Sequence, residues 1–314
     1  MLVGAHEVEV FEGARARLEA IAYRLLGSAA DAEDAVQDTF LRWQSADREL
    51  VETPEAWLTK VLTNICLNRL TSARARRETY VGQWLPEPVF AGDRMLGPSD
   101  TVEQRESVSI AMLTLMERLS AKERAVYVLR EAFGYAHAEI AGMLDLTEAN
   151  CQQIHRRAKQ HLAGDRRRVA VDAAAARKIV EEFLAAALSG KTDSLVRMLT
   201  DDAISIGDGG GVVFSVPRPI TGALRVARFL RTLFTPSEAK WEMVGGRPEL
   251  LATVANGVPA LVMVVGERVV GVFALDVTTD GIAAVHAQAN PAKLERATRQ
   301  WAVSGQGEPL TGDW

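Results

Sequence analysis

The residues best suited to chemistry in this chain are hydrogen-bond donors gathered on one segment near its middle. They are Gln152, Gln153, Arg156, Arg157 and Lys159. Amide and guanidinium groups match the edges of bases, and lysine and arginine also match phosphates, so this set predicts recognition of duplex DNA. Between Glu148 and Leu162 no further acidic residue occurs, and Arg166-Arg167-Arg168 follows. An ordinary helical bundle with a polar outer face is the alternative interpretation.

Three short helices must position these donors. Ser120 and Glu123 have the spacing of a capping box and predict where the first helix begins. The second follows Gly134 and ends at Asp145-Leu146-Thr147, where the threonine can cap the third. The residues expected to face inward are Ala125, Leu129, Ala132, Phe133, Ile140, Ala141, Leu144, Cys151, Ile154, Ala158 and Leu162. This pattern predicts a helix-turn-helix whose third helix reads DNA.

A second set of donors occupies the N-terminal part: Asn64, Asn68, Arg69 and Arg74. Residues 7–77 have helical periodicity, broken at Gly27-Ser28 and between Ser45 and Thr53, which predicts three helices. The third would begin with Thr53 as its cap and Pro54 in its first turn, leaving Lys60 and the donors on its outer side. Amides that bind flipped bases and arginines that follow the backbone suit single-stranded DNA. A solvated basic helix is the alternative.

The middle of these three helices, about Asp31 to Gln44, should have one apolar and one acidic face. Its inward residues are expected to be Ala35, Val36, Thr39, Phe40 and Trp43. Its outward residues are expected to be Glu33, Asp34, Gln37, Asp38, Leu41 and Arg42.

After residue 168 the composition changes, and helices and strands both occur. An alanine-rich helix is expected over Asp172 to Ser189 and another around Leu224 to Phe234. The expected strands are Val212 to Val216, Lys240 to Gly245, Val258 to Val265, Val269 to Val277 and Ile282 to Ala289. Together these elements predict an α+β domain in which a curved sheet wraps on helices.

The linker from Glu78 to Asp100 is rich in proline and glycine, which excludes a long helix. Within it, Trp84 and Leu85 precede Pro86-Glu87-Pro88, and a free linker has little reason to carry large apolar residues stiffened by prolines. We expect Trp84 and Leu85 to dock. Packing on the N-terminal helical domain and anchoring of the C-terminal domain are equal alternatives.

Size, charge and cysteines limit the class of protein. A chain of 314 residues indicates two or three domains with real hydrophobic cores. The net charge is −5, and residues 1–168 carry 22 basic against 25 acidic residues, so tight DNA binding would need a positively charged partner. Cys66 and Cys151 fall in separate predicted helices and are expected to be buried thiols. The sequence has neither a secretory signal nor a membrane span, so a cytoplasmic protein is expected.

The run from Asp31 to Phe40, the helix from Trp57 to Arg77 and the module from Ser120 to Leu162 together resemble an extracytoplasmic-function sigma factor over about the first 165 residues. The resemblance implies that Asp34, Gln37 and Asp38 face RNA polymerase core. It implies that Asn64, Asn68, Arg69 and Arg74 contact the −10 promoter element. It also implies that the third helix of the second module enters the major groove of the −35 element.

The C-terminal half resembles the cone-shaped, polyketide-cyclase-like (SnoaL-like) domain of the nuclear-transport-factor-2-like superfold, which a subgroup of these sigma factors carries. Three signature segments carry this resemblance: Trp84 to Pro88, Asp208-Gly209-Gly210-Gly211, and Asn290-Pro291-Ala292-Lys293-Leu294. Val212 stands where the subgroup usually has lysine, so that lysine's role cannot be transferred. The resemblance implies a regulator within the chain in place of a separate anti-sigma factor.

Catalysis by the cone would need Asp208 and His286 to face one pocket with perturbed pKa values. A structural histidine in a strand and an aspartate in a turn are the simpler interpretations, so no enzymatic activity, cofactor or metal is expected. Ligand binding or domain contact is favoured instead. The alternative function is a small-molecule sensor or enzyme tethered to DNA by the helical domains.

The prediction is therefore a multidomain chain. It has two all-α DNA-binding domains, the second a helix-turn-helix, and then an α+β cone with a curved mixed sheet. The expected ranges are 1–77 for the first, 78–100 for the linker, 101–168 for the second and 169–314 for the cone. RNA polymerase core and promoter DNA are the expected partners, a ligand of the cone remains open, and no membrane association is expected.

Overall fold

The computed structural model describes residues 5–47, 51–78, 80–98, 101–162, 172–304 and 309–310. The chain forms two compact units. The first comprises residues 1–79, 92–108 and 112–165, and the second comprises 80–91, 109–111 and 166–314. The segment 80–91, which follows the N-terminal helices, thus belongs to the C-terminal unit.

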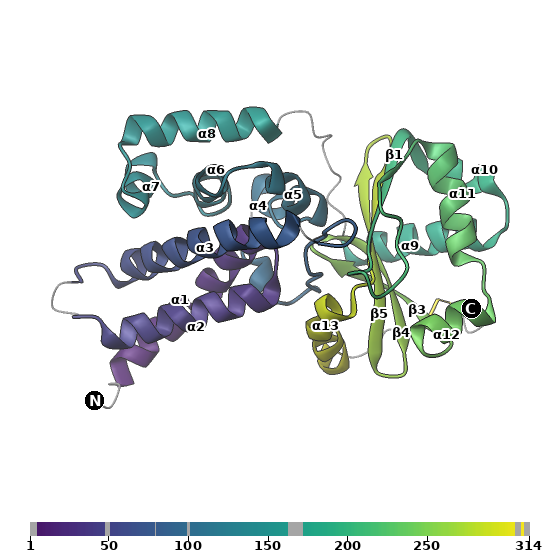
Figure 1. Cartoon of the computed structure of the whole chain (residues 1–314), viewed down its shortest axis with the longest axis horizontal. Coiled ribbons are helices and arrows are strands. Elements are labelled where there is room, and N and C mark those ends of the chain that lie inside the picture. The colour runs from purple at the N-terminus through teal and green to yellow at the C-terminus, as the bar shows by residue number, and fades with distance from the viewer. Residues whose placement is uncertain are drawn as a thin grey trace. The chain divides into compact units, whose positions relative to one another are not determined.

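The first unit begins with three helices that pack on one another (Figure 1): α1 (Ala5–Leu26), α2 (Ala29–Ser45) and α3 (Pro54–Glu78). The Ser28 hydroxyl accepts a hydrogen bond from the Asp31 amide at 3.1 Å and starts α2. Pro54 is the first residue of α3, where its missing N–H costs nothing. The apolar periodicity and these two starts explain why three helices were predictable here.

The rest of the first unit is also helical. Its elements are η2 (Arg94–Leu96), α4 (Val102–Glu106), α5 (Ile110–Leu115), which begins in the second unit, η3 (Met116–Arg118), α6 (Ala121–Tyr127), a π turn η4 (Val128–Ala132), α7 (His137–Leu144) and α8 (Glu148–Leu162). The predicted capping box forms, because the Ser120 amide donates to Glu123 at 2.9 Å and the Glu123 amide donates to the Ser120 hydroxyl at 3.3 Å. The helix-turn-helix is therefore confirmed.

The second unit is built on a six-stranded sheet. Its strands are β1 (Leu199–Asp208), β2 (Ile220–Thr221), β3 (Glu249–Ala255), β4 (Val258–Val265), β5 (Arg268–Thr278) and β6 (Gly281–Gln288). They lie in the order β2-β1-β6-β5-β4-β3. Only the β1–β6 pair is parallel among the pairs of described strands, so the sheet is mixed, as predicted.

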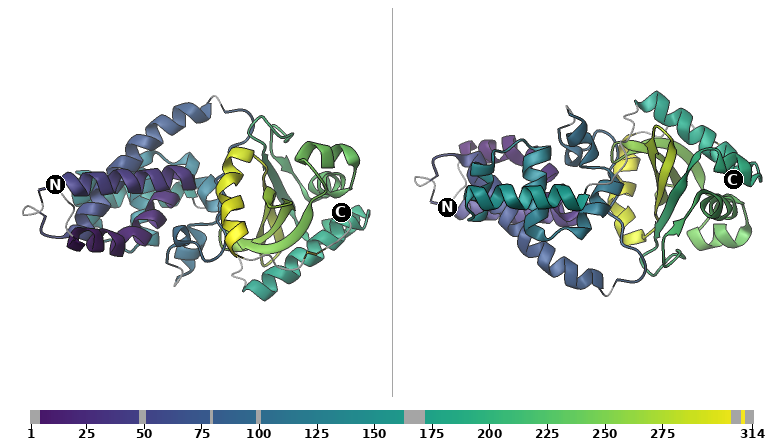
Figure 2. Two further views of the ribbon diagram at one scale, coloured as in Figure 1. Left: turned by 90° about the horizontal axis from the view of Figure 1, so that it is seen from below. Right: turned by 90° about the horizontal axis from the view of Figure 1, so that it is seen from above.

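Helices cover both faces of this sheet (Figure 2). On one face lie α9 (Ala173–Leu188), α10 (Thr192–Val196), α11 (Ala223–Phe234) and α12 (Glu238–Val244). On the other lies α13 (Pro291–Ser304), which packs Leu294, Ala297 and Trp301 against Val262, Val264 and Val272. Alternate residues of β3, β4 and β5 therefore enter two different cores.

Two predicted strands were wrong. Residues 240–245 lie in α12 and its end, because Trp241 and Val244 have helical spacing and Gly245, at φ 87°, forms the left-handed C-cap. Residues 212–216 form no strand, because the amides of Val212 and Val213 both donate to the Gly209 carbonyl in a tight turn. The strand instead precedes the glycines as β1, where the adjacent Asp201 and Asp202 interrupt the apolar alternation.

Candidate functional site

The helix α8 presents the predicted DNA-reading face. Cys151, Ala158 and Leu162 are buried, and Ile154 is half-buried. The side chains predicted to face outward are all exposed: Gln152, Gln153, Arg156, Arg157 and Lys159. Lys159 lies 3.5 Å from Glu131, and Gln152 donates to Glu148 at 3.3 Å. The face thus offers amide and guanidinium donors to solvent on a helix whose opposite side is anchored.

The turn before α8 fixes its direction. Asp145 adopts φ 51° in the left-handed region, and the Leu146 amide donates to the Ala141 carbonyl at 2.9 Å. The Thr147 hydroxyl accepts from the Asn150 amide at 3.2 Å and caps α8, as the sequence predicted. The angle between α7 and α8 therefore depends on backbone geometry that three consecutive residues supply.

A chain of polar side chains joins η4, α7 and α8 beneath this face. His137 Nε2 lies 3.2 Å from His155 Nδ1, and His155 Nε2 lies 2.7 Å from the Glu131 carboxylate. The hydrogen bond from His155 lowers the pKa of Glu131 most, against the opposing effect of burial. Burial, with the charge of His155, lowers the pKa of His137.

The acidic face of α2 and the donors of α3 meet in this structure. Arg69 donates to Asp38 at 2.6 Å, with Asp34 at 3.7 Å and Asp31 at 3.9 Å. Asn64 is half-buried and Asn68 is exposed. The Arg74 side chain lies outside the described residues. A residue predicted to bind DNA therefore pairs with residues predicted to bind polymerase.

Lys60 corrects one expectation. Its ammonium group donates to the Gly142 carbonyl at 2.9 Å and to Asp145 at 3.1 Å, so it is engaged with the end of α7 and is not free on the outer side of α3. The Thr59 hydroxyl lies 3.1 Å from the Tyr135 hydroxyl on the same side. These contacts link the N-terminal helices to the helix-turn-helix inside the first unit.

Two buried arginines strengthen that link. Arg24 donates to the Ser107 hydroxyl at 2.8 Å and to the Leu96 carbonyl at 2.6 Å, and burial lowers its pKa to about 10. Arg124 donates to the Leu25 carbonyl at 2.8 Å and to Glu117 at 2.7 Å, and burial lowers its pKa to about 9. Both stay charged near neutral pH, where carbonyl oxygens stabilise them. Sequence periodicity gave no signal for either, since an arginine is ordinarily exposed.

Both cysteines are buried and free, as predicted. Burial raises the pKa of the Cys66 thiol to about 12, which makes it a poor nucleophile.

The predicted docking segment, Trp84 to Pro88, packs on the C-terminal sheet. Leu85 is fully buried with Ile110 of α5 and Ala274 of β5. Its amide donates to Asp208 at 2.9 Å, and its carbonyl accepts from Lys293 at 2.7 Å. Of the two alternatives for this segment, the described contacts match anchoring of the C-terminal domain.

Asp208 is the centre of a buried polar cluster, which we call the Asp208 cluster: Tyr80, Asp208, Gln288, Asn290 and Lys293. Asp208 accepts from the Tyr80 hydroxyl at 2.6 Å and from the Lys293 ammonium at 2.6 Å, and its side chain is 0% exposed. The Asn290 amide donates to the Tyr80 oxygen at 2.7 Å. Burial, reinforced by Asp208, raises the pKa of Tyr80 well above its ordinary value.

Lys293 also lies against two aromatic rings. Its ammonium group is 4.3 Å from the centre of the Trp84 ring and 4.8 Å from that of Tyr80. All three signature segments of the sequence thus converge on one ammonium group and one carboxylate. Sequence reasoning missed Tyr80 and Gln288, although a glutamine at the end of a mostly apolar strand was a usable signal for a buried polar partner.

The three glycines after Asp208 permit this close packing. A Cβ atom on Gly209 would lie 1.9 Å from the Val213 carbonyl oxygen, and one on Gly210 would lie 2.4 Å from the Asn290 amide group. Gly210 and Gly211 have φ 62° and 74°. At Gly209 the chain thus packs closely on its own next turn, where a larger residue would collide with the Val213 carbonyl.

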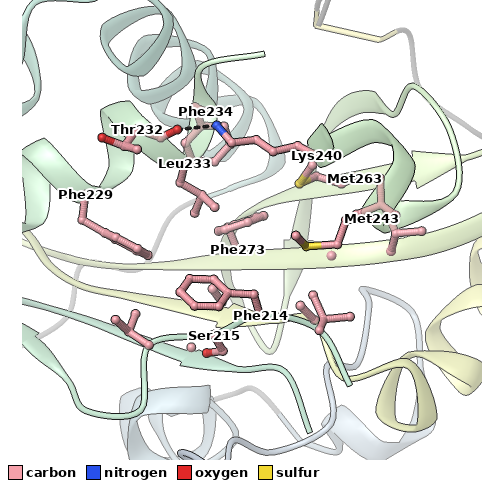
Figure 3. Close-up of a pocket in the computed structure, with 18 of the residues that line it drawn as sticks. Phe214, Ser215, Phe229, Thr232, Leu233, Phe234, Lys240, Met243, Met263 and Phe273 are labelled. Atoms are coloured by element: carbon pink, nitrogen blue, oxygen red, sulfur yellow. Dashed lines mark hydrogen bonds between the residues drawn. The ribbon is translucent and has the colours of Figure 1, made fainter. Parts of the chain in front are cut away.

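A cavity of about 240 Å³ lies on the opposite side of the sheet (Figure 3). Gly207 of β1 and Ala287 of β6 line it, whereas the neighbouring Asp208 and His286 do not. Because side chains alternate along a strand, Asp208 and His286 point away from the cavity. The geometry required for catalysis by this pair is therefore absent from the described residues.

Comparisons with known proteins agree with this architecture. Residues 10–76 match sigma-70 region 2, and residues 109–162 match sigma-70 region 4. The sigma factor SigJ of Mycobacterium tuberculosis is 37% identical over 225 residues, which are 71% of this chain and 72% of SigJ. A probable sigma factor of the same organism, SigI, is 30% identical over 289 residues, which are 90% of this chain and 92% of SigI.

The crystal structure of M. tuberculosis SigJ matches with a TM-score of 0.70 and 30% identity, over 91% of this chain and 97% of that one. Among the described residues, no helix is both long and apolar enough to cross a membrane. Two helical regions in the sigma-70 order, followed by a domain that SigJ shares, leave one conclusion. This chain belongs to the extracytoplasmic-function family of RNA polymerase sigma factors.

Proposed function

We propose that this sigma factor, which directs RNA polymerase core to specific promoters and initiates transcription, is regulated in cis by its C-terminal domain. The observation that carries the proposal is the hydrogen bond from the Leu85 amide to the buried carboxylate of Asp208. It makes the chain between the two promoter-binding regions part of the fold of the C-terminal domain.

The docked segment shortens the part of the chain that is free to connect the two promoter-binding regions. Val89 and Phe90 continue the contact, because the Val89 amide donates to the buried side chain of Asn256 at 3.0 Å and Phe90 packs on Trp301. A segment fixed over residues 80–90 cannot serve as a free linker. Release of this segment would lengthen the connection between regions 2 and 4 and change which promoter geometries the sigma factor can span.

For the −35 element we propose contacts from the exposed face of α8. Gln152 and Gln153 would hydrogen-bond base edges, and Arg156, Arg157 and Lys159 would contact bases or phosphates. Their exposure supports this assignment.

For the −10 element we propose Asn64, Asn68, Arg69 and Arg74, and for polymerase core Asp34, Gln37 and Asp38. The Arg69–Asp38 ion pair means that the two sets are joined in the unbound protein. Binding of polymerase to the acidic face would release Arg69 for DNA. This order of events makes −10 recognition depend on polymerase, which suits a chain with a net charge of −5.

Sigma factors carry out no covalent chemistry themselves, and the positions of Asp208 and His286 give the C-terminal domain no catalytic pair. The alternative in which the C-terminal domain is an enzyme therefore lacks the acid–base pair that the sequence offered for it, Asp208 and His286. A sensor that acts on transcription is compatible with the cavity in the C-terminal domain.

The test is in-vitro transcription with core polymerase over a promoter library, comparing the full chain with a truncation after Arg168. Promoter-specific transcripts from the full chain are expected, and the truncation should change their yield. The direction of that change gives the sign of regulation. Equal transcript yields from both forms would contradict regulation in cis. If neither form produced transcripts, the assignment of promoter-specific initiation would be contradicted.

A further inference from the structure

We infer that the cavity of the C-terminal domain binds a neutral, apolar small molecule of about two fused rings that carries one hydrogen-bonding group. The consequence for transcription rests on the proposed function above, whereas the binding itself does not. Four observations support the inference: the cavity's lining, its charge, an unpaired hydroxyl group and its connection to the docking segment.

The lining is aromatic and flexible. Phe229, Phe234 and Phe273 form its walls with Met243 and Met263. Figure 3 shows Phe214 and Ser215 across the cavity from Phe229 and Leu233 of α11. Phe214 is 77% exposed and Met243 is 55% exposed, so large apolar side chains stand at the opening without cover. Aromatic and methionine side chains of this kind bind flat apolar molecules.

Charge within the cavity excludes an ionic ligand. The only charged side chain among the described lining residues is Lys240, and its ammonium group donates to the Thr232 and Thr235 carbonyls at 2.5 Å each. The lysine therefore closes the end of α11 and is not available to an anion.

One polar group in the lining lacks a partner. The Ser215 hydroxyl oxygen is buried and has no hydrogen bond to any described residue. Ser215 lines the cavity, and such an unsatisfied group costs free energy until it gains a partner. A hydroxyl, carbonyl or ring N–H on the ligand would satisfy it.

The size of the ligand follows from the volume. An apolar cavity of about 150 Å³ in another protein holds benzene. The present 240 Å³ therefore suits a molecule roughly one and a half times that size, such as a bicyclic ring.

The cavity and the docking segment share one stretch of backbone. Gly207 lines the cavity, Asp208 holds Leu85, and Gly209 packs on the Val213 carbonyl immediately before Phe214 and Ser215. A ligand that presses on Phe214 and Ser215 thus acts on the same turn that positions Asp208. Occupation of the cavity would strengthen or weaken docking of Trp84 to Pro88, and the sigma factor would respond to an apolar metabolite.

The binding test uses the purified full chain and two probes, naphthalene and 2-naphthol, in equilibrium dialysis. Both should bind, and 2-naphthol should bind about three- to tenfold more tightly because its hydroxyl pairs with Ser215. Ser215→Ala should remove this preference and leave naphthalene binding unchanged. A preference that survives Ser215→Ala would overturn the role of the serine.

Variants that fill the cavity test its position. Ala287→Phe and Val270→Phe should each weaken both probes at least tenfold, whereas Val303→Phe, on the exposed side of α13, should not. Thermal unfolding shows whether each filling variant is folded. If one of the two is not folded, the test relies on the other filling variant. Absence of probe binding to the wild-type chain, or unchanged binding by a folded filling variant, would overturn the inference. Since no polymerase is present, this failure is separate from failure of the proposed regulation.

Discussion

At the scale of the residue, Asp208 is where the three signature segments meet. One of its carboxylate oxygens accepts from Leu85 and Lys293, and the other accepts from Tyr80 and Gly210. A fully buried carboxylate is tolerated only because each of these donors is directed at it. The Gln288 side-chain amide is a fifth donor, at 3.4 Å. The most distant donor, Tyr80, lies 128 residues away in the sequence, so this one side chain joins distant segments of the C-terminal unit.

Asp208→Asn tests how much the Asp208 carboxylate contributes to the stability of the C-terminal unit. The amide cannot pair with the Lys293 charge and leaves that charge buried, so the C-terminal unit should lose about 2–4 kcal/mol of stability. Urea unfolding followed by circular dichroism measures the loss. Asp280→Asn, at an exposed turn, is the matched control and should change stability by less than about 0.5 kcal/mol. Equal effects of the two substitutions would contradict the central position of Asp208.

Arg156→Ala tests the face of α8. If Arg156 reads a base, binding of the polymerase complex to its promoter should weaken by about 1–3 kcal/mol, with relaxed preference at one position of the −35 element. A promoter-library binding assay resolves that position. The control is Lys122→Ala, an exposed cation of α6. A uniform loss across all sequences would make Arg156 a phosphate contact instead.

At the scale of the element, the helix-turn-helix combines predictable and unpredictable features. The capping box at Ser120, the inward stripe of α8 and the cap at Thr147 follow from residue types at fixed spacing. The π turn at Val128–Ala132 and the chain from His137 to Glu131 do not, because they depend on contacts between helices.

The C-terminal sheet illustrates the same limit. Strands β4, β5 and β6 were predicted because continuous valine-rich runs end at clear turns. Strand β1 was missed because Asp201 and Asp202 interrupt its alternation, and α12 was misassigned because seven residues are too few for periodicity to distinguish helix from strand. For the site, the segments Trp84 to Pro88 and Asn290 to Leu294 were identified from the sequence, but only the fold shows that both contact Asp208.

The histidine chain between α7 and α8 predicts a pH dependence. His137 has a lowered pKa in the folded state, so it binds a proton more weakly there than in the unfolded chain. Its stability contribution is complete above about pH 6.5 and is lost as the pH falls below that value. Four charged or titratable groups act on His137. His155 and Arg130 oppose its protonation, and Glu148 and Glu131 favour it.

The unfolding temperature of the full chain should fall between pH 7.5 and pH 5.5. The decrease should be larger in the wild type than in His137→Gln. Gln160→Ala, at an exposed neutral position of α8, should behave like the wild type. An unchanged pH dependence in His137→Gln would show that another group is responsible.

At the scale of the whole molecule, the charge of the chain and its contacts describe a factor that needs its polymerase. The net charge of −5 opposes unaided DNA binding, and Arg69 is held by Asp38. The C-terminal unit includes the segment that follows region 2, so regulation and promoter recognition share the same stretch of chain.

Asp38→Arg tests the polymerase surface. The reversed charge should repel Arg69 and remove the acidic contact, so retention by immobilised core polymerase should fall at least tenfold. Asp47→Arg, just after α2 and also exposed, is the matched control. Retention equal to that of the wild type would place the polymerase contact elsewhere.

The measurement that tests the central claim most directly is transcription by the full chain carrying Leu85→Asp. Leu85 is 0% exposed in the second unit, so an aspartate there should expel the docking segment from the sheet and leave both promoter-binding regions intact. Val81→Asp, at a 68% exposed position of the same stretch, is the control. The prediction is a change in transcript yield of severalfold with Leu85→Asp, in the same direction as truncation after Arg168, and no change with Val81→Asp. Wild-type yields from Leu85→Asp, in a variant whose docking segment is shown by proteolysis to be released, would contradict regulation through this segment.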